Sequence, residues 1–473
     1  MSEARIVTEA DPRFETEVPV VIVGAGAAGL VAALACHGAG VEPLVIERDP
    51  VPRGSTSLSA GLIPAPGTRF QRERGIEDDA ATFARDIQKK AHGHADPVLV
   101  RLVADTVAPA IEWLADAHGL PFSVVHDFDY PGHSNRRMHG LPSRSGAELV
   151  DRLRQAAEQA QIPLLTEARV TTLIRDAAGA IRGLVAERPD GSAERIGARA
   201  VVLACCGYAG NKALVRKYIP ELADALYFGH PGNEGEAVLW GEQLGASLRD
   251  MTGHQGHGSV AHPQGILVSW AVIMEGGFQV NLDGTRFWNE SSGYSEAGVA
   301  VLKQRDGVAW DIFDARISGI TRQFEDFRSA EAQGAVLTAG SIEELAAKAK
   351  LPVAALAATL AQVEALKSAG ARDGFGRDWS RAAPLAAPYC AVRVTGALFH
   401  SQGGLAIDEA ARVRLADGGI VPNLFAAGGA ACGVSGPEAS GYLSGNGLLT
   451  AVALGRIAGQ GAAGCAAQAA RAE

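Results

Sequence analysis

The chain has 473 residues, 47% of them hydrophobic and 20% charged, and a formal net charge of −10 at pH 7. This is the composition of a globular protein, and the length predicts two domains. The acidic balance argues against a nucleic-acid partner, because binding to phosphate backbones requires a basic surface. The longest apolar runs are too short to span a membrane, and the charged N-terminus lacks the apolar core of a secretory signal. We therefore expect a cytoplasmic protein with no membrane span and with its six cysteines reduced.

The N-terminal segment carries a strand, a glycine-rich turn, a helix and a second strand in direct succession. The β-branched run 18–23 predicts a strand buried in a parallel sheet. The turn GAGAAG at 24–29 then opens a helix that is expected to end near Gly38. A second strand over 42–46 ends at Glu47, about 20 residues beyond the turn. This order of elements is the complete dinucleotide-binding unit.

Each signature residue of this unit has an expected role in holding a dinucleotide. Gly24 permits the tight turn, Gly26 lets a pyrophosphate approach the backbone, and Gly29 allows close packing of the helix on the strand. The helix N-terminus offers unpaired N–H groups and partial positive charge to the phosphates. Glu47 suits a ribose 2′-hydroxyl and disfavours a 2′-phosphate.

Further elements follow from the hydrophobic patterning. Residues 77–118 predict helices, and 145–161 predicts a helix with a serine N-cap. Strands are expected over 168–175, 181–187 and 198–204. From about residue 252 to 397 the chain changes character, with Gly/His-rich loops, a strand over 277–281 and helices over 341–367. Returning strands are expected at 407–413 and 424–427, followed by a final helix over 446–459 and a frayed Ala-rich tail.

Runs of small residues favour FAD over NAD as the cofactor. The loop 53–61, RGSTSLSAG, offers a backbone against which a flavin could lie, and 203–208 and 424–429 end strands in similar turns. The segment 444–449 opens the final helix, whose N-terminus would stabilise an anionic reduced flavin. The residues predicted to bind FAD are Gly24, Gly26, Ala27, Ala28, Gly29, Glu47, Arg48, Ser55, Thr56, Ser57, Ser59, Ala60, Gly61, Val170, Ala204, Cys205, Gly207, Gly428, Gly429, Ser444, Asn446, Gly447, Leu448 and Leu449.

The ordered motifs resemble those of one flavoprotein superfamily. VIVGAGAAGL, STSLSAG, GTRFWNES, FHSQGGLAID, NLFAAGG and GYLSGNGLL resemble the superfamily of fumarate reductase, succinate dehydrogenase and the 3-ketosteroid dehydrogenases over almost the whole chain. We therefore expect an α/β fold: a Rossmann-like FAD-binding domain, with a parallel sheet, helices and additional β-strands, over 1–252 and 398–473. An inserted α+β substrate-capping domain is expected over 253–397. Ser55 stands where succinate dehydrogenases attach FAD through a histidine, so the resemblance implies non-covalent FAD.

Four residues fall in the segments that face the flavin in this superfamily: His257, Tyr294, His400 and Tyr442. The resemblance places substrate-orienting histidines of fumarate reductases at His257 and His400, and this chain keeps both. It places the proton-delivering arginine at Tyr294 and the carboxylate-clamping arginine at Tyr442. A single hydroxyl does not replace a bidentate, permanently charged guanidinium, so a small dicarboxylate would lose its main anchors.

The two tyrosines favour a ketone substrate. Steroid dehydrogenases of the superfamily carry a tyrosine after the N-E-S element, and Tyr442-Leu443-Ser444 resembles the Tyr-x-Ser pair of the Δ4-(5α) branch. The implied reaction removes a proton α to the carbonyl while hydride passes from the β-carbon to flavin N5. Tyr442, with Ser444, is the candidate group that polarises the carbonyl. Tyr294 is the candidate base, with His257 or His400 as alternatives.

Two other functions compete with this hypothesis. The first is an ene-reductase of the fumarate reductase type acting on an unsaturated carboxylic acid, which would require an arginine elsewhere, such as Arg136 or Arg393. The second is a non-catalytic binding protein on the same scaffold. The expected partners are a small ketone or acid substrate and an electron acceptor whose class the sequence leaves open. No metal is expected, because the histidines of 254–262 lack an acidic or cysteine partner at ligand spacing.

Two clusters of reactive side chains remain. The adjacent thiols of Cys205 and Cys206 are expected to pack as small residues beside the cofactor, since a disulfide between neighbours would be strained. The segment YPGHSNRRMHG is expected to be a solvated loop or to assist an anionic substrate group or an FAD phosphate. Its basic residues are His133, Arg136, Arg137 and His139.

Overall fold

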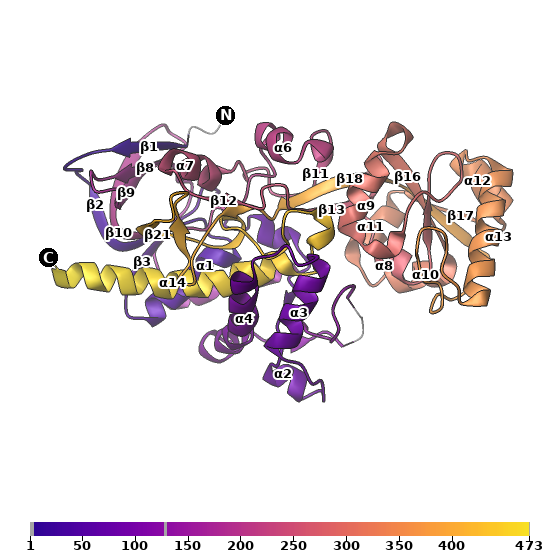
Figure 1. The fold of residues 1–473 in the computed structure, drawn as a ribbon, viewed down its shortest axis with the longest axis horizontal. Helices are drawn as coiled ribbons and strands as arrows, with labels where there is room; N and C mark the ends of the chain where they lie inside the picture. The colour runs from indigo at the N-terminus through magenta and orange to yellow at the C-terminus, as the bar shows by residue number, and fades with distance from the viewer. Residues whose placement is uncertain (1–3, 127–129, 473) are drawn as a thin grey trace. The chain divides into compact units, whose positions relative to one another are not determined.

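The computed structural model describes residues 4–126 and 130–472 (Figure 1). It divides into two compact units. Unit 1 comprises Met1–Ile219, Gly229–His254 and His400–Glu473, and unit 2 comprises Pro220–Phe228 and Gln255–Phe399. Each unit has a hydrophobic core of its own. Within the described ranges, no helix combines the length and apolarity that crossing a membrane requires.

Unit 1 is built on a mixed sheet in the order β1-β8-β9-β10-β2-β3-β7, with β21 paired to β10 and to β20. Strands β2, β3, β10 and β21 run parallel, and the antiparallel strands β8 and β9 extend the sheet. The bounds are β1 Arg5–Thr8, β2 Thr16–Val23, β3 Pro43–Ile46, β7 Leu164–Leu165, β8 Arg169–Arg175, β9 Ile181–Glu187, β10 Ala193–Leu203, β20 Arg412–Arg414 and β21 Ile420–Ala426. The predicted parallel sheet with additional β-strands is confirmed.

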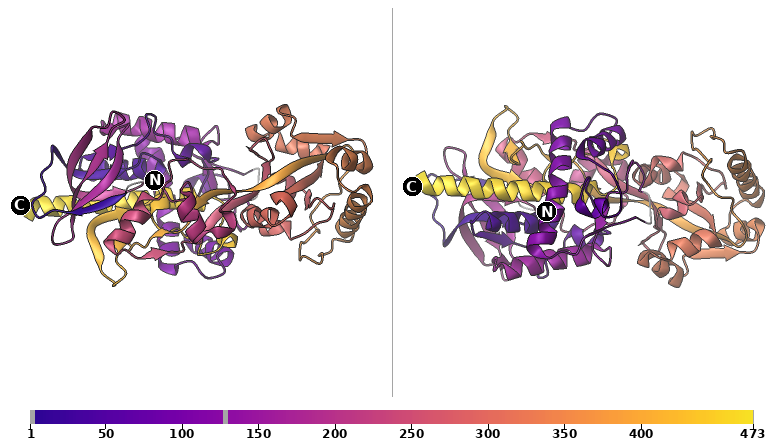
Figure 2. Two further views of the ribbon diagram at one scale, coloured as in Figure 1. Left: turned by 90° about the horizontal axis from the view of Figure 1, so that it is seen from above. Right: turned by 90° about the horizontal axis from the view of Figure 1, so that it is seen from below.

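The helices of unit 1 cover this sheet and extend beside it (Figure 2). Their bounds are α1 Ala27–Gly38, α2 Arg69–Arg72, α3 Ala80–Lys90, α4 Pro97–His118, α5 Gly146–Gln159, α6 Lys212–Tyr218, α7 Glu236–Leu244 and α14 Asn446–Ala472. Short 3-10 turns lie at η1 Ser55–Leu58, η5 Gly428–Ala430 and η6 Ala439–Gly441. Small sheets are formed by β4 Ile63–Pro64, β6 Met138–Gly140 and β5 Ser123–Val124, and by β12 Leu248–Arg249 and β19 Gly404–Leu405.

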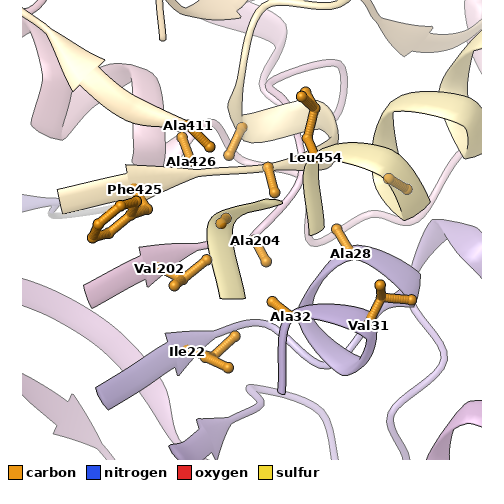
Figure 3. Packing of buried hydrophobic residues seen from close by; sticks show 14 of the residues in the cluster. Ile22, Ala28, Val31, Ala32, Val202, Ala204, Ala411, Phe425, Ala426 and Leu454 are labelled. Carbon is orange, nitrogen blue, oxygen red and sulfur yellow. The ribbon is translucent and has the colours of Figure 1, made fainter. Parts of the chain in front are cut away.

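Helix α14 packs directly on α1 and on the sheet (Figure 3). Gly455 and Gly459 make this approach possible, because a methyl group at either position would overlap a backbone carbonyl of α1. The prediction that the helix ends at Gly459 and that the tail frays is wrong: α14 continues to Ala472. The reason is that the alanines of its later turns, such as Ala462 and Ala466, are buried against the core.

A second correction concerns the strand expected over 407–413. The structure has a hairpin there, in which β20 pairs antiparallel with β21 and Ile407 forms a bridge with Val413. Asp408 reverses the chain, since its carboxylate accepts hydrogen bonds from the backbone N–H groups of Ala410 and Arg412. In the sequence, an aspartate that closes a turn in this way looks like one polar position of an alternating strand.

Unit 2 is the predicted α+β insertion. Its antiparallel sheet runs in the order β14-β13-β18-β16-β15, with β11 and β17 also paired to β18. The strands are β11 Leu226–Tyr227, β13 His254–Ala261, β14 Ile266–Leu267, β15 Phe278–Val280, β16 Val308–Asp314, β17 Val336–Ala339 and β18 Tyr389–Ser401. The helices are α8 Ala271–Met274, α9 Tyr294–Leu302, α10 Ala315–Thr321, α11 Glu325–Ala332, α12 Ile342–Ala349 and α13 Val353–Ala369. They bury aromatic side chains such as Phe313, Phe327 and Trp379.

Candidate functional site

The segments predicted to bind FAD come together at one edge of the unit 1 sheet. Parallel strands β2, β3, β10 and β21 end at Val23, Ile46, Leu203 and Ala426, and the glycine turn, Glu47, Ala204 and the η5 turn follow them. The carboxyl edge of a parallel sheet is where α/β proteins bind ligands. Close contacts connect these segments, since a methyl group added at Gly24 would lie 2.5 Å from the Ala204 carbonyl oxygen.

The glycine turn leaves room at the position where a pyrophosphate would need it. Gly24 has a φ of +104°, which side chains rarely adopt, and a methyl group at Gly29 would overlap the Gly24 carbonyl oxygen. At Gly26, by contrast, the nearest atom to an added methyl group would be Thr56 Oγ1 at 3.4 Å. Gly26 is also the N-cap of α1 and provides no side-chain cap, so N–H groups at the start of the helix remain available to an anion.

Polar groups from neighbouring loops fix this turn. The Glu47 carboxylate accepts a hydrogen bond of 2.8 Å from the Ala25 N–H, and Thr56 Oγ1 accepts one of 3.0 Å from the Ala27 N–H. Ser55 Oγ accepts a hydrogen bond of 2.7 Å from the Asn233 side-chain amide. The loop 54–59 is thus held against the start of α1. Arg48, after the second strand, donates to the Gly232 carbonyl at 2.9 Å.

The start of α14 lies at the same end of unit 1. The η5 turn contacts α1, because a methyl group at Gly428 would be 2.9 Å from Ala28 Cβ. Asn446 is fully buried, and its Oδ1 atom has no hydrogen-bond partner among residues 4–126 and 130–472. A buried orphan acceptor is costly unless a bound group satisfies it. The open glycine turn, the uncapped helix and this orphan atom together fit a dinucleotide such as FAD.

The remaining predicted FAD-binding residues surround these points. Val170 is buried in β8, whose preceding residue Ala168 donates its N–H to the Glu47 carbonyl at 3.0 Å. Gly207 follows Cys206, which has a φ of +65°, and Cys205 and Cys206 are free thiols. Burial raises the pKa values of both thiols. The others lie in the loop around η1, the η5 turn or the first turn of α14: Ser57, Ser59, Ala60, Gly61, Gly429, Gly447, Leu448 and Leu449.

His400 and Tyr442 form a contact inside unit 1. Their ring centroids lie 5.4 Å apart, edge to face, and Tyr442 is 6% exposed. Burial lowers the pKa of His400 to about 4 and raises that of Tyr442 far above its usual value. Backbone hydrogen bonds from Gly447 and Gly445 oppose the shift at Tyr442, so its hydroxyl lies at the N-terminus of α14. Both side chains are therefore neutral near pH 7, and Ser444 is buried in the same turn.

A hydrogen-bond chain that sequence reasoning missed orients His400. Gln402 Nε2 lies 2.9 Å from His400 Nδ1, and Gln402 Oε1 accepts a bond of 2.6 Å from Ser435 Oγ. Ser435 Oγ in turn accepts one of 3.0 Å from Asn446 Nδ2. Ser401 O is the more distant neighbour of Nδ1, at 3.3 Å, so we assign the tautomer from the Gln402 contact. In that assignment the imidazole proton is on Nε2, which faces Gly447.

His257 and Tyr294 form the second predicted group, inside unit 2. The imidazole stacks on Tyr294, at 5.1 Å, and on Phe399, at 5.4 Å. Its Nδ1 accepts a hydrogen bond of 3.1 Å from the Ser259 N–H, so the proton of the neutral ring is on Nε2. Burial lowers the pKa of His257 to about 3. The predicted catalytic residues thus form two groups. His400 and Tyr442 are in contact in unit 1, and His257 and Tyr294 are in contact in unit 2.

The basic cluster is not a solvated loop at all of its positions. Arg137 and His139 are buried, at 1% and 0% exposure, and the expectation of solvation is wrong for them. Arg137 forms ion pairs with Asp78 at 2.8 Å and with Asp86 at 2.5 Å, so its charge is neutralised within the protein. Arg136, the preceding residue, is exposed and donates to a backbone carbonyl. The charge pattern alone gave no sign of the two aspartates, which lie 59 and 51 residues earlier in the chain.

Two further polar residues, Arg393 and Asp311, lie in strands of the unit 2 sheet. Arg393 lies in β18 opposite Trp310. Asp311 in β16 is fully buried, accepts hydrogen bonds from Ser259 Oγ and Gln279 Nε2, and has a pKa raised by burial to about 7. Among the residues that the structure describes, no three His, Cys, Asp or Glu side chains gather where they could hold a metal ion.

Three buried or partly buried histidines predict a loss of stability in acid. Burial lowers the pKa values of His133, His139 and His400 in unit 1 to about 4. The unfolded chain, with histidine pKa values near 6.5, binds more protons than the folded chain between about pH 4 and 6.5, so stability falls as pH falls through that range. Each histidine should cost about 1 kcal/mol between about pH 7.5 and 5.5. Urea unfolding at the two pH values measures this.

A matched pair of variants tests the origin of this pH dependence. His400→Gln should reduce the difference between the two unfolding free energies, whereas His92→Gln, at an exposed position, should leave it unchanged. Equal stability of the unaltered protein at both pH values would contradict the conclusion that these histidines are neutral in the folded protein.

Comparison with known proteins gives the family. Residues 19–448 match the family described as FAD binding domain. The chain is 32% identical over 444 residues to a probable fumarate reductase of Shewanella frigidimarina, covering 94% of this chain and 74% of that protein. It is 29% identical over 474 residues to a urocanate reductase of Eggerthella lenta, and the match covers 98% of this chain and 77% of that protein. Among solved structures, a 3-ketosteroid-Δ4-(5α)-dehydrogenase of Rhodococcus jostii superposes with a TM-score of 0.78 at 25% identity, covering 98% of this chain and 99% of that one.

Two of these relatives are named as reductases, of fumarate and of urocanate, and the third as a dehydrogenase of a 3-ketosteroid. The curated relatives are reductases of unsaturated acids, so they support the acid-reductase alternative better than the ketone dehydrogenase that the two tyrosines favoured. The protein is an FAD-dependent reductase or dehydrogenase acting on CH–CH bonds, and the chain belongs to the FAD-binding flavoprotein family of fumarate reductase and succinate dehydrogenase.

Proposed function

We propose that the protein reduces the C=C bond of an α,β-unsaturated carboxylic acid that carries one carboxylate. Its curated relatives act on unsaturated acids, and urocanate, the substrate in one of their names, has a single carboxylate. The observation behind the limit to one carboxylate is the neutral pair at the start of α14, in which Tyr442 is buried and His400 is partly buried. Fumarate reductases, by the resemblance described above, place a carboxylate-clamping arginine at the position of Tyr442. Without that fixed charge, a second carboxylate would be desolvated with no ionic partner.

The neutral pair is suited to hold one carboxylate or carbonyl oxygen. The Tyr442 hydroxyl keeps its proton at all pH values near neutrality, because burial raises its pKa, and can donate it in a hydrogen bond. The His400 Nε2–H is a second donor in the tautomer set by Gln402. Both lie at the N-terminus of the 27-residue helix α14, whose partial positive charge favours negative charge on a substrate oxygen. Donors fixed before the reaction stabilise charge that develops on that oxygen.

Bound FAD, once reduced by an external electron donor, would supply the hydride, and the protein must supply a proton to the neighbouring carbon. We assign the proton to the Tyr294 hydroxyl, which occupies the position of the proton-delivering arginine in the resemblance. The stacking of Tyr294 on His257 holds the phenol ring in one orientation. His257 stays neutral because burial lowers its pKa to about 3, so it acts as a hydrogen-bond donor through Nε2 and not as an acid.

We further propose that FAD is bound without a covalent link. Ser55 stands at the position where succinate dehydrogenases carry a linking histidine, and its hydroxyl accepts a hydrogen bond from Asn233. A serine hydroxyl in this loop has neither the nucleophilicity nor the reach of an imidazole. Denaturation in acid followed by centrifugation should release the yellow cofactor into the supernatant, and colour that stays with the precipitate would contradict this.

Dehydrogenation of a ketone is the second candidate. The specific observation in its favour is Tyr442-Leu443-Ser444, because a neutral hydroxyl pair binds an uncharged carbonyl oxygen without the desolvation cost of a carboxylate. The 25% identity to a 3-ketosteroid-Δ4-(5α)-dehydrogenase over nearly its full length points the same way. The same protein groups would bind the oxygen of either substrate. The acid brings a negative charge to those groups and the ketone does not.

Reoxidation of the reduced enzyme separates the two candidates. The purified protein is reduced with dithionite without air and mixed with urocanate, acrylate, fumarate, cyclohexenone or 4-androstene-3,17-dione, and the return of flavin absorbance is recorded. We expect the unsaturated monoacids to reoxidise the flavin fastest. If only an enone reoxidises the flavin, or if a saturated ketone bleaches the oxidised enzyme, the substrate is a ketone and the proposal of an unsaturated acid is wrong.

Replacing Tyr442 by phenylalanine should slow the reaction without unfolding the protein. The variant keeps the ring that packs on His400 and removes one donor to the substrate oxygen. Loss of one such donor typically lowers kcat by roughly 10²-fold. Single-turnover reoxidation of the reduced enzyme by urocanate measures this effect.

Tyr218→Phe is the matched control, because the Tyr218 hydroxyl bonds Glu242 at the surface of unit 1. This variant should react at the rate of the unaltered enzyme. A Tyr442→Phe variant with an unchanged rate would remove Tyr442 from the substrate site.

A further inference from the structure

A segment of the basic cluster touches the turn that precedes α14. His133 Nε2 lies 2.9 Å from the carbonyl oxygen of Ser444, which is 311 residues further along the chain. Gly132 reaches the same turn, since a methyl group there would lie 2.7 Å from Leu443 Cδ1. Gly445 in that turn has a φ of +88°, and a methyl group on it would lie 2.7 Å from Pro64. The turn 443–445 is therefore enclosed by residues 64 and 132–133.

The protonation of His133 is determined at both ends of the ring. Arg137 Nη1 lies 3.2 Å from His133 Nδ1, and a guanidinium can only donate, so Nδ1 carries no proton. The Ser444 carbonyl can only accept, so Nε2 carries the proton. Burial and the Arg137 charge keep the ring neutral by lowering the pKa of His133 to about 4. The two contacts require one and the same tautomer.

Arg137 is itself immobile. Its Nε and Nη2 atoms donate to the two oxygens of Asp78 at 2.8 and 2.9 Å, and Nη1 donates to Asp86. The guanidinium also stacks over the Phe83 ring at 4.8 Å, and Phe83 stacks on His133. A planar fork held by two carboxylates has no rotational freedom, so the Nη1–H that faces His133 has a fixed direction.

We propose that His133 is a positioning residue: through its Nε2–H it holds the Ser444 carbonyl, and so fixes where the N-terminus of α14 and Tyr442 stand relative to the flavin ring. This inference rests on the assignment of FAD and of Tyr442 to the proposed site. A free Ser444 carbonyl could rotate toward the flavin and oppose the positive end of α14. Reduced, anionic flavin would then be stabilised less than oxidised flavin, and the midpoint potential would fall.

Three substitutions at one position test the proposal. In His133→Gln the side-chain amide N–H stands near the place of Nε2 and can still reach Ser444. His133→Asn places its amide near Nδ1 and cannot. His133→Phe keeps the ring stacked on Phe83 and has no donor. The readout is the flavin midpoint potential measured by dye-linked reduction of the FAD-loaded protein, together with KM and kcat for urocanate.

We expect His133→Asn and His133→Phe to weaken binding of reduced relative to oxidised FAD about tenfold, a fall in potential of about 30 mV for a two-electron couple. His133→Gln should stay within about threefold of the unaltered protein. Loss of FAD from the Asn variant but not from the Gln variant also supports the proposal. Potentials of the Asn and Phe variants equal to that of the unaltered protein, or a Gln variant that behaves like them, would overturn it.

The potential measurement separates this inference from the proposed function, because it needs no substrate. If no unsaturated acid reoxidises the enzyme but the potentials differ as expected, the substrate assignment fails and the positioning role stands. If urocanate is reduced but the three variants have the same potential, the positioning role fails alone.

Discussion

Replacing Arg137 by methionine should lower the free energy of unfolding of unit 1 by about 3–5 kcal/mol. The side chain of Asp78 is 0% exposed and that of Asp86 is 11% exposed, and both would lose their ionic partner. Burial acts to raise the pKa of Asp78, but hydrogen bonds to Arg137, Asn135 and Gln71 outweigh it and hold the pKa below its usual value. That ion pair therefore stabilises the fold above the unfolded pKa and loses its effect as pH falls through the folded pKa. Urea unfolding followed by circular dichroism gives the difference.

The neighbouring residue supplies the control for this prediction. Arg136 is exposed, so Arg136→Met removes the same charge and should change the free energy of unfolding by less than about 1 kcal/mol. The cost of Arg137→Met should also shrink at about pH 4, where carboxylates begin to protonate. Similar effects of the two substitutions at pH 7 would mean that the Arg137 cluster does not stabilise unit 1.

Gly29→Ala should weaken the binding of FAD. The added methyl group would overlap the Gly24 carbonyl oxygen, and a backbone atom in a turn closed by Ala204 has no room to retreat. Forcing the glycine turn open costs about 1–3 kcal/mol or more, which corresponds to roughly 10- to 100-fold weaker binding. The ratio of flavin to protein absorbance after gel filtration, and titration of the apoprotein with FAD, measure the loss.

Gly38→Ala is the matched change in the same helix. No atom lies within 4 Å of a methyl group at Gly38, so the substitution should leave FAD binding unchanged and should not destabilise α1. Equal FAD affinity of the Gly29→Ala and Gly38→Ala variants would show that the turn is not the pyrophosphate site.

The fold was largely predictable from the sequence because its central strands have strong local signatures. The runs that became β2 and β10 are apolar and β-branched, and each is followed by a glycine or another small residue. The hairpin at 407–414 was missed because Asp408 closes its turn through its side chain, which hydrophobic alternation does not reveal. The continuation of α14 was missed because alanines are weak indicators of a core, although Ala462 and Ala466 are buried.

The residues of the candidate site were predictable where they stand within a recognisable sequence motif. His400 and Tyr442 were found because each stands in a motif that resembles the flavin-facing segments of the superfamily, and they contact each other inside unit 1. Their orientation was not predictable, because it depends on Gln402 and Ser435, which are 33 residues apart. His133 was visible only as a member of a basic cluster. Its contact with Ser444 spans 311 positions, and no local pattern encodes a pairing of that range.

The central claim is that the neutral pair at the start of α14 accepts one carboxylate and not two. Acrylate and fumarate test it directly, since both are small and they differ in the second carboxylate. The measurement is the second-order rate constant for reoxidation of the reduced enzyme by each acid at pH 7. The account predicts that acrylate reacts at least about tenfold faster, because the second carboxylate of fumarate would be desolvated without a partner. A fumarate rate equal to or above that of acrylate would contradict it.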